Sequence, residues 1–463
     1  MKRIVLFYPA LTNGGDAPTL YVDLPLSVVT LAAQFDPAEF EVEIVDERLG
    51  PCTPGEIARK CAGALFVGIS AITSYQIVNG LRIARAVRDG DKAVPIVWGG
   101  WHPSLMPQET IAHPLVDMVM VGQGEQILPL LARCLARGDG LDSVPNLWWK
   151  QGGRVVRNPR REYPDFQMPR NLIEGYRRLD LTPYVHPQWG HRRVIGYESS
   201  RGWPCACAFC SISAVFERRW YGLEAARVAG DIAWLKKQYD IDAVHFFDNN
   251  FFIDRRRAAD IARLFIERGL DIAWDGTVVA QQFVRFSPAE IDHLRESGLF
   301  RVILGGESGD EEVLRRIHKQ HTNEQMLESV RICREYDLLP SLSFMVGFPW
   351  DPAGDVRRTI SLIEQIKHIE PRTEILLFLF SPYLGTPLYE VAKDYGMVFP
   401  ASLEGWAGFT YDKANTPWIT PALSRKISRY LAFFGTKELS GEEEAFFRGF
   451  EGGASPSTSC AET

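Results

Sequence analysis

The sequence predicts an α/β protein with two principal domains: a doubly wound parallel sheet, followed by a partial parallel barrel of six strand-helix units. Three observations predict this class. Short apolar runs alternate with amphipathic helical stretches, which favours parallel sheets with crossover helices. Glycine and polar residues follow several of these runs, at the strand ends where open α/β sheets bind ligands. With 463 residues, 46% of them hydrophobic, the chain is long enough for two or three domains with separate cores.

Charge and hydropathy restrict the possible partners. The formal net charge of −7, from 51 basic and 58 acidic residues, gives no electrostatic basis for binding a nucleic-acid backbone or an anionic membrane. No segment approaches ~20 uninterrupted apolar residues, so we expect no membrane span. The amino-terminal stretch has no signal-peptide cleavage pattern. We therefore expect a cytoplasmic protein that acts on a small-molecule or protein substrate.

Five apolar runs that end in loops are the expected strands of the first domain: residues 3–9, 41–47, 64–71, 95–100 and 117–125. In such a domain a ligand lies beyond the carboxyl ends of the strands. The candidate contacts there are Ser70, Thr73, Gly99, Gly100, Gly122, Gly124 and Glu125. Hydroxyls offer hydrogen bonds and glycines let a large ligand approach the backbone, but glycines also serve ordinary strand-to-helix turns. The pattern alone leaves both interpretations open.

A connection follows the first domain. Residues 146–166 read "NLWWKQGGRVVRNPRREYPDF", which predicts a β-hairpin with a Gly-Gly turn and then an irregular linker. The second domain is expected to contain helices at residues 223–239 and 256–268. Its expected strands are residues 193–200, 242–248, 271–278, 301–307, 342–348 and 374–380. Chemistry in parallel barrels takes place at the carboxyl ends of the strands.

Three cysteines follow the first of these strands, in "ESSRGWPCACAFCSI" (residues 198–212). Thiolates as close in sequence as Cys205, Cys207 and Cys210 favour a soft metal, either zinc or an iron-sulfur cluster. A structural zinc ion takes four protein ligands, and no second cysteine pair or nearby Cys/His pair completes the set. Three ligands leave one coordination position open.

Motifs in both halves carry a resemblance to a known family. "VEIVDER", "FVGISAITSYQIVNGLRIARAVR" and "VWGGWHPSLMPQETIAHPLVDMVMVGQGE" resemble the cobalamin-binding domain of cobalamin-dependent radical S-adenosylmethionine (radical SAM) proteins. The cysteine loop, "FFDNNFF", "LGGESGDEEVLRRIHKQHT", "SFMVGFPWD" and "SPYLGTPLYE" resemble the radical SAM barrel in the same order. The resemblance covers roughly residues 3–395. It implies a Rossmann-like cobalamin domain and a partial (β/α)6 TIM-type barrel.

The resemblance also implies roles for individual residues. It implies that Cys205, Cys207 and Cys210 hold a 4Fe-4S cluster. It implies that S-adenosylmethionine is contacted by Phe209 and Gly347 near the adenine, Asp248 and Asn249 at the methionine moiety or ribose, and Glu307 and Ser308 at the ribose hydroxyls or amino group. Each of these six S-adenosylmethionine contacts could instead be a capping or turn residue.

Two departures from the family pattern stand out. The family loop has its first cysteine at the position of Trp203, so Cys205 is the candidate replacement ligand. After Asp46 the chain reads "DERLG" and lacks the histidine that ligates cobalt in cobalamin mutases. Similar radical SAM proteins also hold cobalamin without that histidine. His102 and His113 are the available substitutes, but turn or surface roles fit them better.

We divide the chain into a cobalamin-binding domain (1–141), a hairpin and linker (142–192), a barrel (193–395), a small carboxyl-terminal piece that could cap the barrel mouth (396–440) and a tail (441–463) predicted to be disordered. The basic run from Arg315 to His321 is either a solvated face or an anionic-substrate contact.

The resemblance implies an enzyme that uses a 4Fe-4S cluster, S-adenosylmethionine, cobalamin and an external electron donor such as a flavodoxin or ferredoxin. Methylation of an unactivated carbon of a small-molecule or natural-product substrate is the expected reaction. Two alternatives stay open: radical ring formation or rearrangement, and a cobalamin-binding protein with a modified or lost cluster that binds or transfers methyl without radicals. The exchange of Trp203 and Cys205 is the feature on which the last alternative depends.

Overall fold

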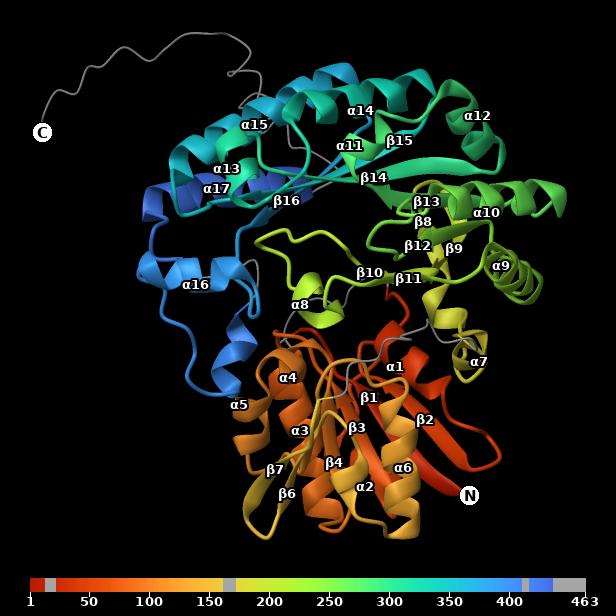
Figure 1. Cartoon of the computed structure of the whole chain (residues 1–463), viewed down its shortest axis with the longest axis vertical. Coiled ribbons are helices and arrows are strands. Elements are labelled where there is room, and N and C mark those ends of the chain that lie inside the picture. The colour runs from red at the N-terminus through yellow and green to blue at the C-terminus, as the bar shows by residue number, and fades with distance from the viewer. Residues whose placement is uncertain (13–21, 161–171, 410–415, 436–463) are drawn as a thin grey trace, which may run out of the picture.

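The computed structural model describes residues 1–12, 22–160, 172–409 and 416–435, and it contains two α/β domains stacked one above the other (Figure 1). The predicted fold class is confirmed. The predicted tail at 441–463 lies outside the described residues. Within the described ranges, no helix has both the length and the apolar character needed to cross a membrane.

The lower domain is a seven-stranded sheet with helices on both faces (Figure 1). Its strands, in spatial order, are β2 (Phe40–Asp46), β1 (Lys2–Tyr8), β3 (Phe66–Ser70), β4 (Ile96–Gly99), β5 (Met118–Met120), β6 (Leu147–Gln151) and β7 (Arg154–Arg157). The first five pair in parallel. The strand order reverses between β1 and β3, and open α/β sheets bind ligands beyond the carboxyl ends of the strands at such a point.

The alternation of side chains along β1 explains the two layers of helices. Successive residues of a strand face opposite sides of its sheet. Ile4 and Leu6 pack with α1 and α6, whereas Val5 and Phe7 pack with α2 and α3. The helices of this domain are α1 (Leu26–Ala32), α2 (Pro54–Cys61), α3 (Gln76–Gly90), α4 (Trp101–Leu105), α5 (Pro107–Ala112) and α6 (Ile127–Arg137), with the short η1 (Leu141–Ser143) after them.

The predicted hairpin forms as β6 and β7, but it belongs to the lower sheet and not to the connection. β6 pairs antiparallel with β5 and places Trp149 opposite Met118. Trp149 is buried against the core on the α6 side of the sheet. β6 thereby covers an edge of β5 that would otherwise expose unpaired backbone groups. The lower sheet therefore extends to Arg157, beyond the predicted boundary at residue 141.

The upper domain is a curled half-barrel of six parallel strands with an antiparallel edge strand. In spatial order its strands are β16 (Glu374–Leu379), β15 (Leu339–Val346), β14 (Leu299–Glu307), β13 (Ala273–Val278), β12 (Ala243–Phe246), β9 (His191–Tyr197) and β8 (His186–Gln188). The six parallel strands match the prediction. The edge strand β8 was not predicted, because a three-residue strand has no periodicity to detect.

Helices cover the convex side of this sheet (Figure 1). They are α9 (Ala225–Tyr239), α10 (Arg255–Glu267), α11 (Ala280–Phe283), α12 (Pro288–Glu296), α13 (Glu311–Arg316), α14 (Asn323–Glu335) and α15 (Pro352–Ile369); α7 (Leu172–Tyr176) and η2 (Thr182–Tyr184) precede the sheet. Reciprocal capping boxes at Ser287 and Thr322 fix where α12 and α14 begin.

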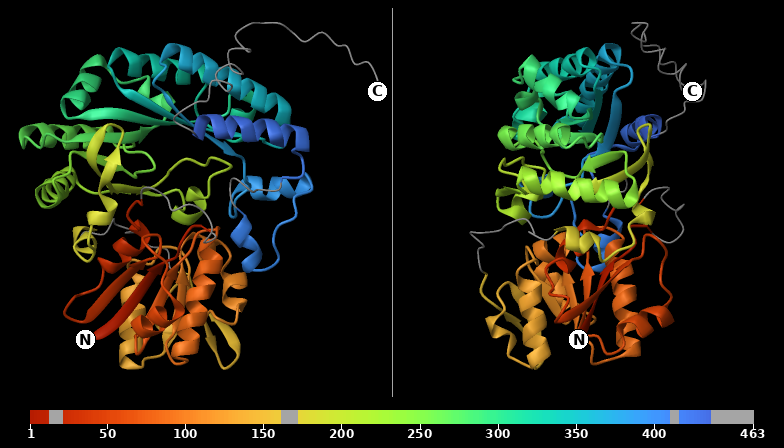
Figure 2. Two further views of the ribbon diagram at one scale, coloured as in Figure 1. Left: turned by 180° about the vertical axis from the view of Figure 1, so that it is seen from behind. Right: turned by 90° about the vertical axis from the view of Figure 1, so that its right-hand side faces the viewer.

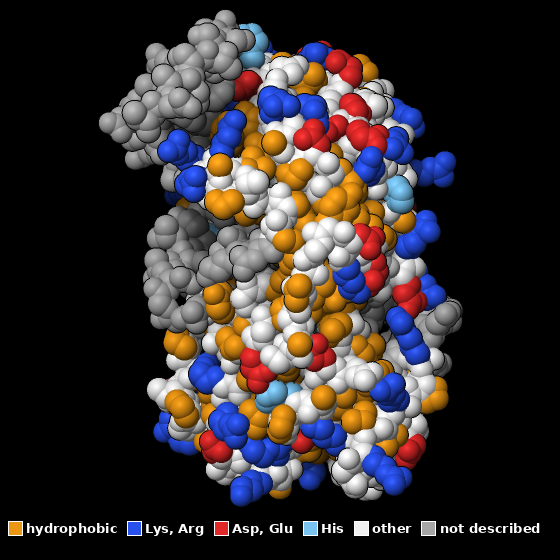
Figure 3. Space-filling model, turned by 90° about the vertical axis from the view of Figure 1, so that its left-hand side faces the viewer, with side chains coloured by type: hydrophobic (Ala, Val, Ile, Leu, Met, Phe, Trp, Pro, Cys, Tyr) orange, Lys and Arg blue, Asp and Glu red, His pale blue; other side chains and the backbone are white. Residues whose placement is uncertain are grey.

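The carboxyl-terminal piece contacts both domains (Figure 2). After α16 (Pro387–Asp394), η3 (Glu404–Gly408) buries Trp406 in the core of the lower domain, and α17 (Pro421–Gly435) then returns to β16. Between them the Trp418 indole donates to the Gly347 carbonyl at 2.9 Å. The described part of this segment thus contacts the barrel where β15 ends. On the side that bears α16, Figure 3 shows apolar side chains gathered between the two domains.

Candidate functional site

A cavity of about 240 Å³ lies between the domains, beyond the carboxyl ends of the lower strands. All but one of the strand-end residues that the sequence indicated line it: Ser70, Gly99, Gly100, Gly122, Gly124 and Glu125. Thr73 does not. The upper domain contributes Glu198, Arg201, Phe216 and Asn249 to the opposite wall. The topology therefore brings three strand ends and the cysteine side of the barrel together around one space.

Two glycines of the lower wall have different roles. Gly100 has a φ of +95°, and a Cβ there would lie 2.7 Å from the Ala71 carbonyl oxygen, so the turn from β4 into α4 requires glycine. A Cβ at Gly122 would instead meet no heavy atom within 4 Å. Gly122 therefore borders open space in which a bulky ligand can approach the backbone.

The remaining wall fits a large cofactor with polar edges. The Ser70 hydroxyl lies 3.0 Å from that of Ser27, and both face the cavity. Leu6, Val97 and Leu128 line its deeper part, between the sheet and the helices of one face. Hydroxyls at the rim, open space above Gly122 and an apolar slot below are the features that a cobalamin needs.

Neither candidate histidine lines this cavity. His102 is fully buried, its Nδ1 lies 2.9 Å from the Thr73 hydroxyl, and burial lowers its pKa to about 4. His113 pairs with Glu404 at 3.2 Å. Thr73 is thus a partner of His102 and not a wall residue. No histidine of the described chain lines the cavity, so these residues fit a cobalamin held without an imidazole below its cobalt.

The cysteines lie on one loop that a two-stranded ribbon closes. β10 (Ser200–Gly202) and β11 (Trp220–Gly222) pair antiparallel at its base, and α8 (Ile212–Phe216) lies within it. The Cys210 N–H donates to the Cys207 carbonyl at 3.2 Å, which forms a turn. Ala208 donates to the Ile317 carbonyl at 2.9 Å and accepts from the Leu388 N–H at 3.1 Å. These bonds anchor the loop to the barrel at its centre.

Lys319 is a charged neighbour that the three thiols share. Burial raises the pKa of each thiol, that of Cys210 to about 11, and the ammonium of Lys319 opposes the shift in all three. Lys319 Nζ lies 2.6 Å from Glu307 Oε1, with both side chains 10% exposed. Without a metal the thiols are therefore protonated, and metal loading must release their protons.

The loop presents three thiols and one tryptophan. Within the described residues, no three His, Cys, Asp or Glu side chains are arranged to hold one metal ion. Thiolates are the usual protein ligands of iron-sulfur clusters. Trp203 is not a ligand type, but its side chain hydrogen bonds to Cys207 and opposes the effect of burial on the pKa of that thiol.

Asp248 is part of the scaffold of the loop in this structure. Its carboxylate is 2% exposed and accepts hydrogen bonds from the Ser199 N–H at 2.7 Å, the Ser199 hydroxyl at 2.6 Å and the Ser200 hydroxyl at 2.5 Å. Its neighbour Asn249 does face the cavity, and its Nδ2 donates to the Gly202 carbonyl at 3.4 Å. Of this predicted pair, only Asn249 is placed to touch a ligand in the cavity.

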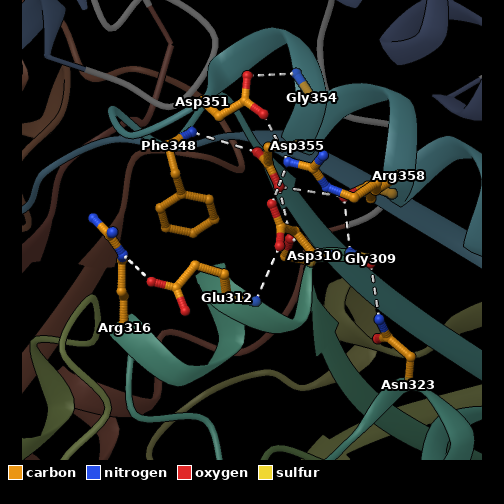
Figure 4. A network of polar contacts seen from close by, with 12 residues as sticks. Gly309, Asp310, Glu312, Arg316, Asn323, Phe348, Asp351, Gly354, Asp355 and Arg358 are labelled. Atoms are coloured by element: carbon orange, nitrogen blue, oxygen red, sulfur yellow. Dashed lines mark hydrogen bonds and ion pairs between the residues drawn. The ribbon is translucent and has the colours of Figure 1, made fainter.

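Asp355 accepts hydrogen bonds from the residues that directly follow β14 and β15. The sequence analysis did not identify it. It accepts from the Ser308 hydroxyl at 2.6 Å and the Gly347 N–H at 3.0 Å, and burial raises its pKa to about 6. Figure 4 shows it beside Asp310 and Arg358, whose side chains are paired at 2.5 Å. The available signal was an acidic residue in the first turn of a helix that follows a strand.

The other predicted contacts lie near the loop. Phe209 packs against the apolar cluster that contains Leu314 and Phe348. The space that a Cβ would occupy at Gly347 is filled by Ile419, 2.7 Å away. Glu307 is engaged by Lys319, which the sequence showed only as part of a basic run.

Comparisons with known proteins match both halves of the chain. A B12 binding domain model matches residues 19–132, and a Radical SAM superfamily model matches residues 199–363. An uncharacterised methyltransferase of Pyrococcus horikoshii is 28% identical over 80% of this chain and 78% of its own length. The anaerobic magnesium-protoporphyrin IX monomethyl ester cyclase of Synechocystis is 24% identical over 85% of this chain and 78% of its own length. The solved structure of the cobalamin-dependent S-adenosylmethionine radical enzyme OxsB has a TM-score of 0.71, at 16% identity, and covers 97% of this chain and 70% of OxsB.

Proposed function

This chain is a radical SAM protein with an amino-terminal B12-binding domain, and we propose that it methylates an unactivated carbon atom of a small-molecule substrate. The cavity carries the proposal, because the predicted cobalamin contacts form one wall and the cysteine side of the barrel forms the other. A substrate between these walls would be within reach of both cofactor sites. The methyltransferase relative that aligns over most of both chains supports the choice of methyl transfer.

The cofactors, when bound, supply a carbon-centred radical from S-adenosylmethionine and a methyl group carried by cobalt. The protein holds these cofactors in position. In the proposal, Cys205, Cys207 and Cys210 hold the cluster, while Ser70, Gly122 and the apolar slot hold cobalamin. Glu307 and Lys319 present one negative and one positive group beside the thiols. These match the amino and carboxylate groups of S-adenosylmethionine in charge.

Ring formation on the same architecture is the second candidate. The observation in its favour is the alignment with a cyclase over 85% of this chain. Product analysis separates the two, because methylation adds one carbon to the substrate and ring formation adds none.

An external electron donor, a flavodoxin or ferredoxin, and a cytoplasmic location are part of the proposal. Their support is that the seven cysteines of the described residues are all free thiols. Thiols persist in reducing compartments, where low-potential donors also operate.

The test is anaerobic reconstitution with iron and sulfide, followed by S-adenosylmethionine cleavage under a low-potential reductant with cobalamin present. We expect about four irons per chain and formation of 5′-deoxyadenosine. Cys207→Ala, Cys210→Ala and Cys205→Ala should each abolish cleavage, whereas Cys52→Ala, a thiol of the lower domain, should not. Cleavage that survives Cys205→Ala would show that another group is the third ligand. A wild-type chain that never holds iron would favour the non-radical alternative.

A further inference from the structure

Arg201 connects the cysteine loop to the lower domain. It lies in β10, directly before the loop, and its guanidinium forms an ion pair with Glu125 of the lower domain. It also pairs with Glu198, whose Oε2 lies 2.6 Å from Nη2 and 2.7 Å from Nε. Arg201 thus bridges two carboxylates, one from each domain.

The bridge is buried. Arg201 and Glu125 are 6% and 7% exposed. Removing one member of a buried ion pair leaves the other charge uncompensated. The two domains therefore cannot separate here without exposing both charges to solvent or leaving one of them buried without a partner. A guanidinium fork also fixes the direction of each carboxylate. The contact therefore sets orientation as well as distance.

All three residues of the bridge also form part of the cavity wall. Glu125 accepts a further hydrogen bond from the Thr30 hydroxyl of α1 at 3.4 Å. The first residues of that helix, Leu26 and Ser27, line the same cavity. A ligand that fills the cavity would therefore restrict α1 and β10, the two elements whose side chains hold the Glu125 carboxylate in place.

On the other side, the backbone at Arg201 is tied to the whole loop. Gly202 has a φ of +88°, and a Cβ there would lie 2.0 Å from the Arg219 carbonyl oxygen at the far end of the loop. Within the loop, the Phe216 ring of α8 lies 6.2 Å from the Trp101 ring of α4. A displacement of Arg201 would therefore move both ends of the segment that carries the cysteines.

From these contacts we propose that the Arg201–Glu125 ion pair couples the cavity to the cysteine loop. A ligand in the cavity restrains Glu125, Glu125 restrains Arg201, and Arg201 restrains the loop. Both are positioning residues, which act through the loop and not on reacting atoms. The inference goes beyond the proposed function, because it concerns how the two sites are held relative to each other and needs no turnover.

Hydrogen exchange in the full-length, iron-free chain tests the coupling, with and without saturating hydroxocobalamin. In the wild type we expect cobalamin to slow exchange of residues 203–219 by about tenfold. In Glu125→Gln, measured at a cobalamin concentration that saturates this variant, that protection should be absent. Glu43→Gln, which removes a partly buried carboxylate paired with Lys60 in the same domain, should keep wild-type protection.

Three results would overturn the inference. They are full protection in Glu125→Gln, no protection in the wild type, and loss of cobalamin binding in Glu125→Gln. The last would make Glu125 a cofactor contact, as the sequence indicated. The cleavage and product assays, which test the proposed function, are independent of all three.

Discussion

Replacing Asp248 with asparagine tests whether this carboxylate belongs to the scaffold or contacts a cofactor. The structure gives it three hydrogen bonds from Ser199 and Ser200. Arg257 donates to the Ser199 hydroxyl at 2.7 Å and to its carbonyl at 2.8 Å, which places the Arg257 charge beside the carboxylate. Asp248 and Arg257 thus hold the junction between β9 and β10, directly before the cysteine loop.

The expected loss of stability is large. Hydrogen bonds to charged groups contribute about 1.5–3 kcal/mol each, and breaking a buried charge pair costs about 3–5 kcal/mol. Asparagine keeps the shape and one acceptor oxygen, so we expect the lower end, about 3 kcal/mol. Ser200→Ala removes one of the three donors and should cost about 1.5 kcal/mol.

The assay is urea unfolding of the metal-free chain at pH 7, read together with hydrogen exchange in residues 194–202. With an m-value of about 3 kcal/mol/M, the unfolding midpoint of the upper domain should fall by about 1 M in Asp248→Asn. No cofactor takes part in this measurement. A variant that unfolds like the wild type but binds S-adenosylmethionine weakly would refute the scaffold role and restore Asp248 as a cofactor contact.

Three further predictions concern the same region. Burial raises the pKa of Asp355 to about 6 from 3.8, so the folded state binds this proton more tightly. The wild type should then gain about 3 kcal/mol relative to Asp355→Asn as the pH falls from about 6 to about 4, and a difference independent of pH in urea unfolding would contradict this. Gly100→Ala should cost at least about 2 kcal/mol, from positive φ and collision with the Ala71 carbonyl, and Gly122→Ala should cost about 1 kcal/mol from φ alone; equal melting temperatures would contradict the difference. Trp203→Phe should retain iron but make the reduction potential more negative, because Cys207 loses a hydrogen bond; an unchanged potential in a redox titration would show that this bond has no effect.

Local pattern was sufficient to predict most of the fold. The parallel strands of both sheets are apolar runs bounded by glycine or polar residues, and each is recognisable from a short window. The cysteine loop was recognisable for the same reason, because its three thiols lie within six residues. Boundaries that depend on distant pairing were not predictable. Nothing near the hairpin indicates that β6 pairs with β5, so the lower sheet extended past the expected limit.

The same contrast applies to the site. The sequence by itself determined which residues stand at strand ends, and six of the seven in the lower domain line the cavity. Only the tertiary structure decided what each side chain contacts. Asp248 meets serines 48 and 49 residues earlier in the chain, and Arg201 meets Glu125 across the domain boundary. The physical reason is that position along a strand is a local property, whereas the partner of a buried charge depends on which distant segments the packing of two domains brings beside it.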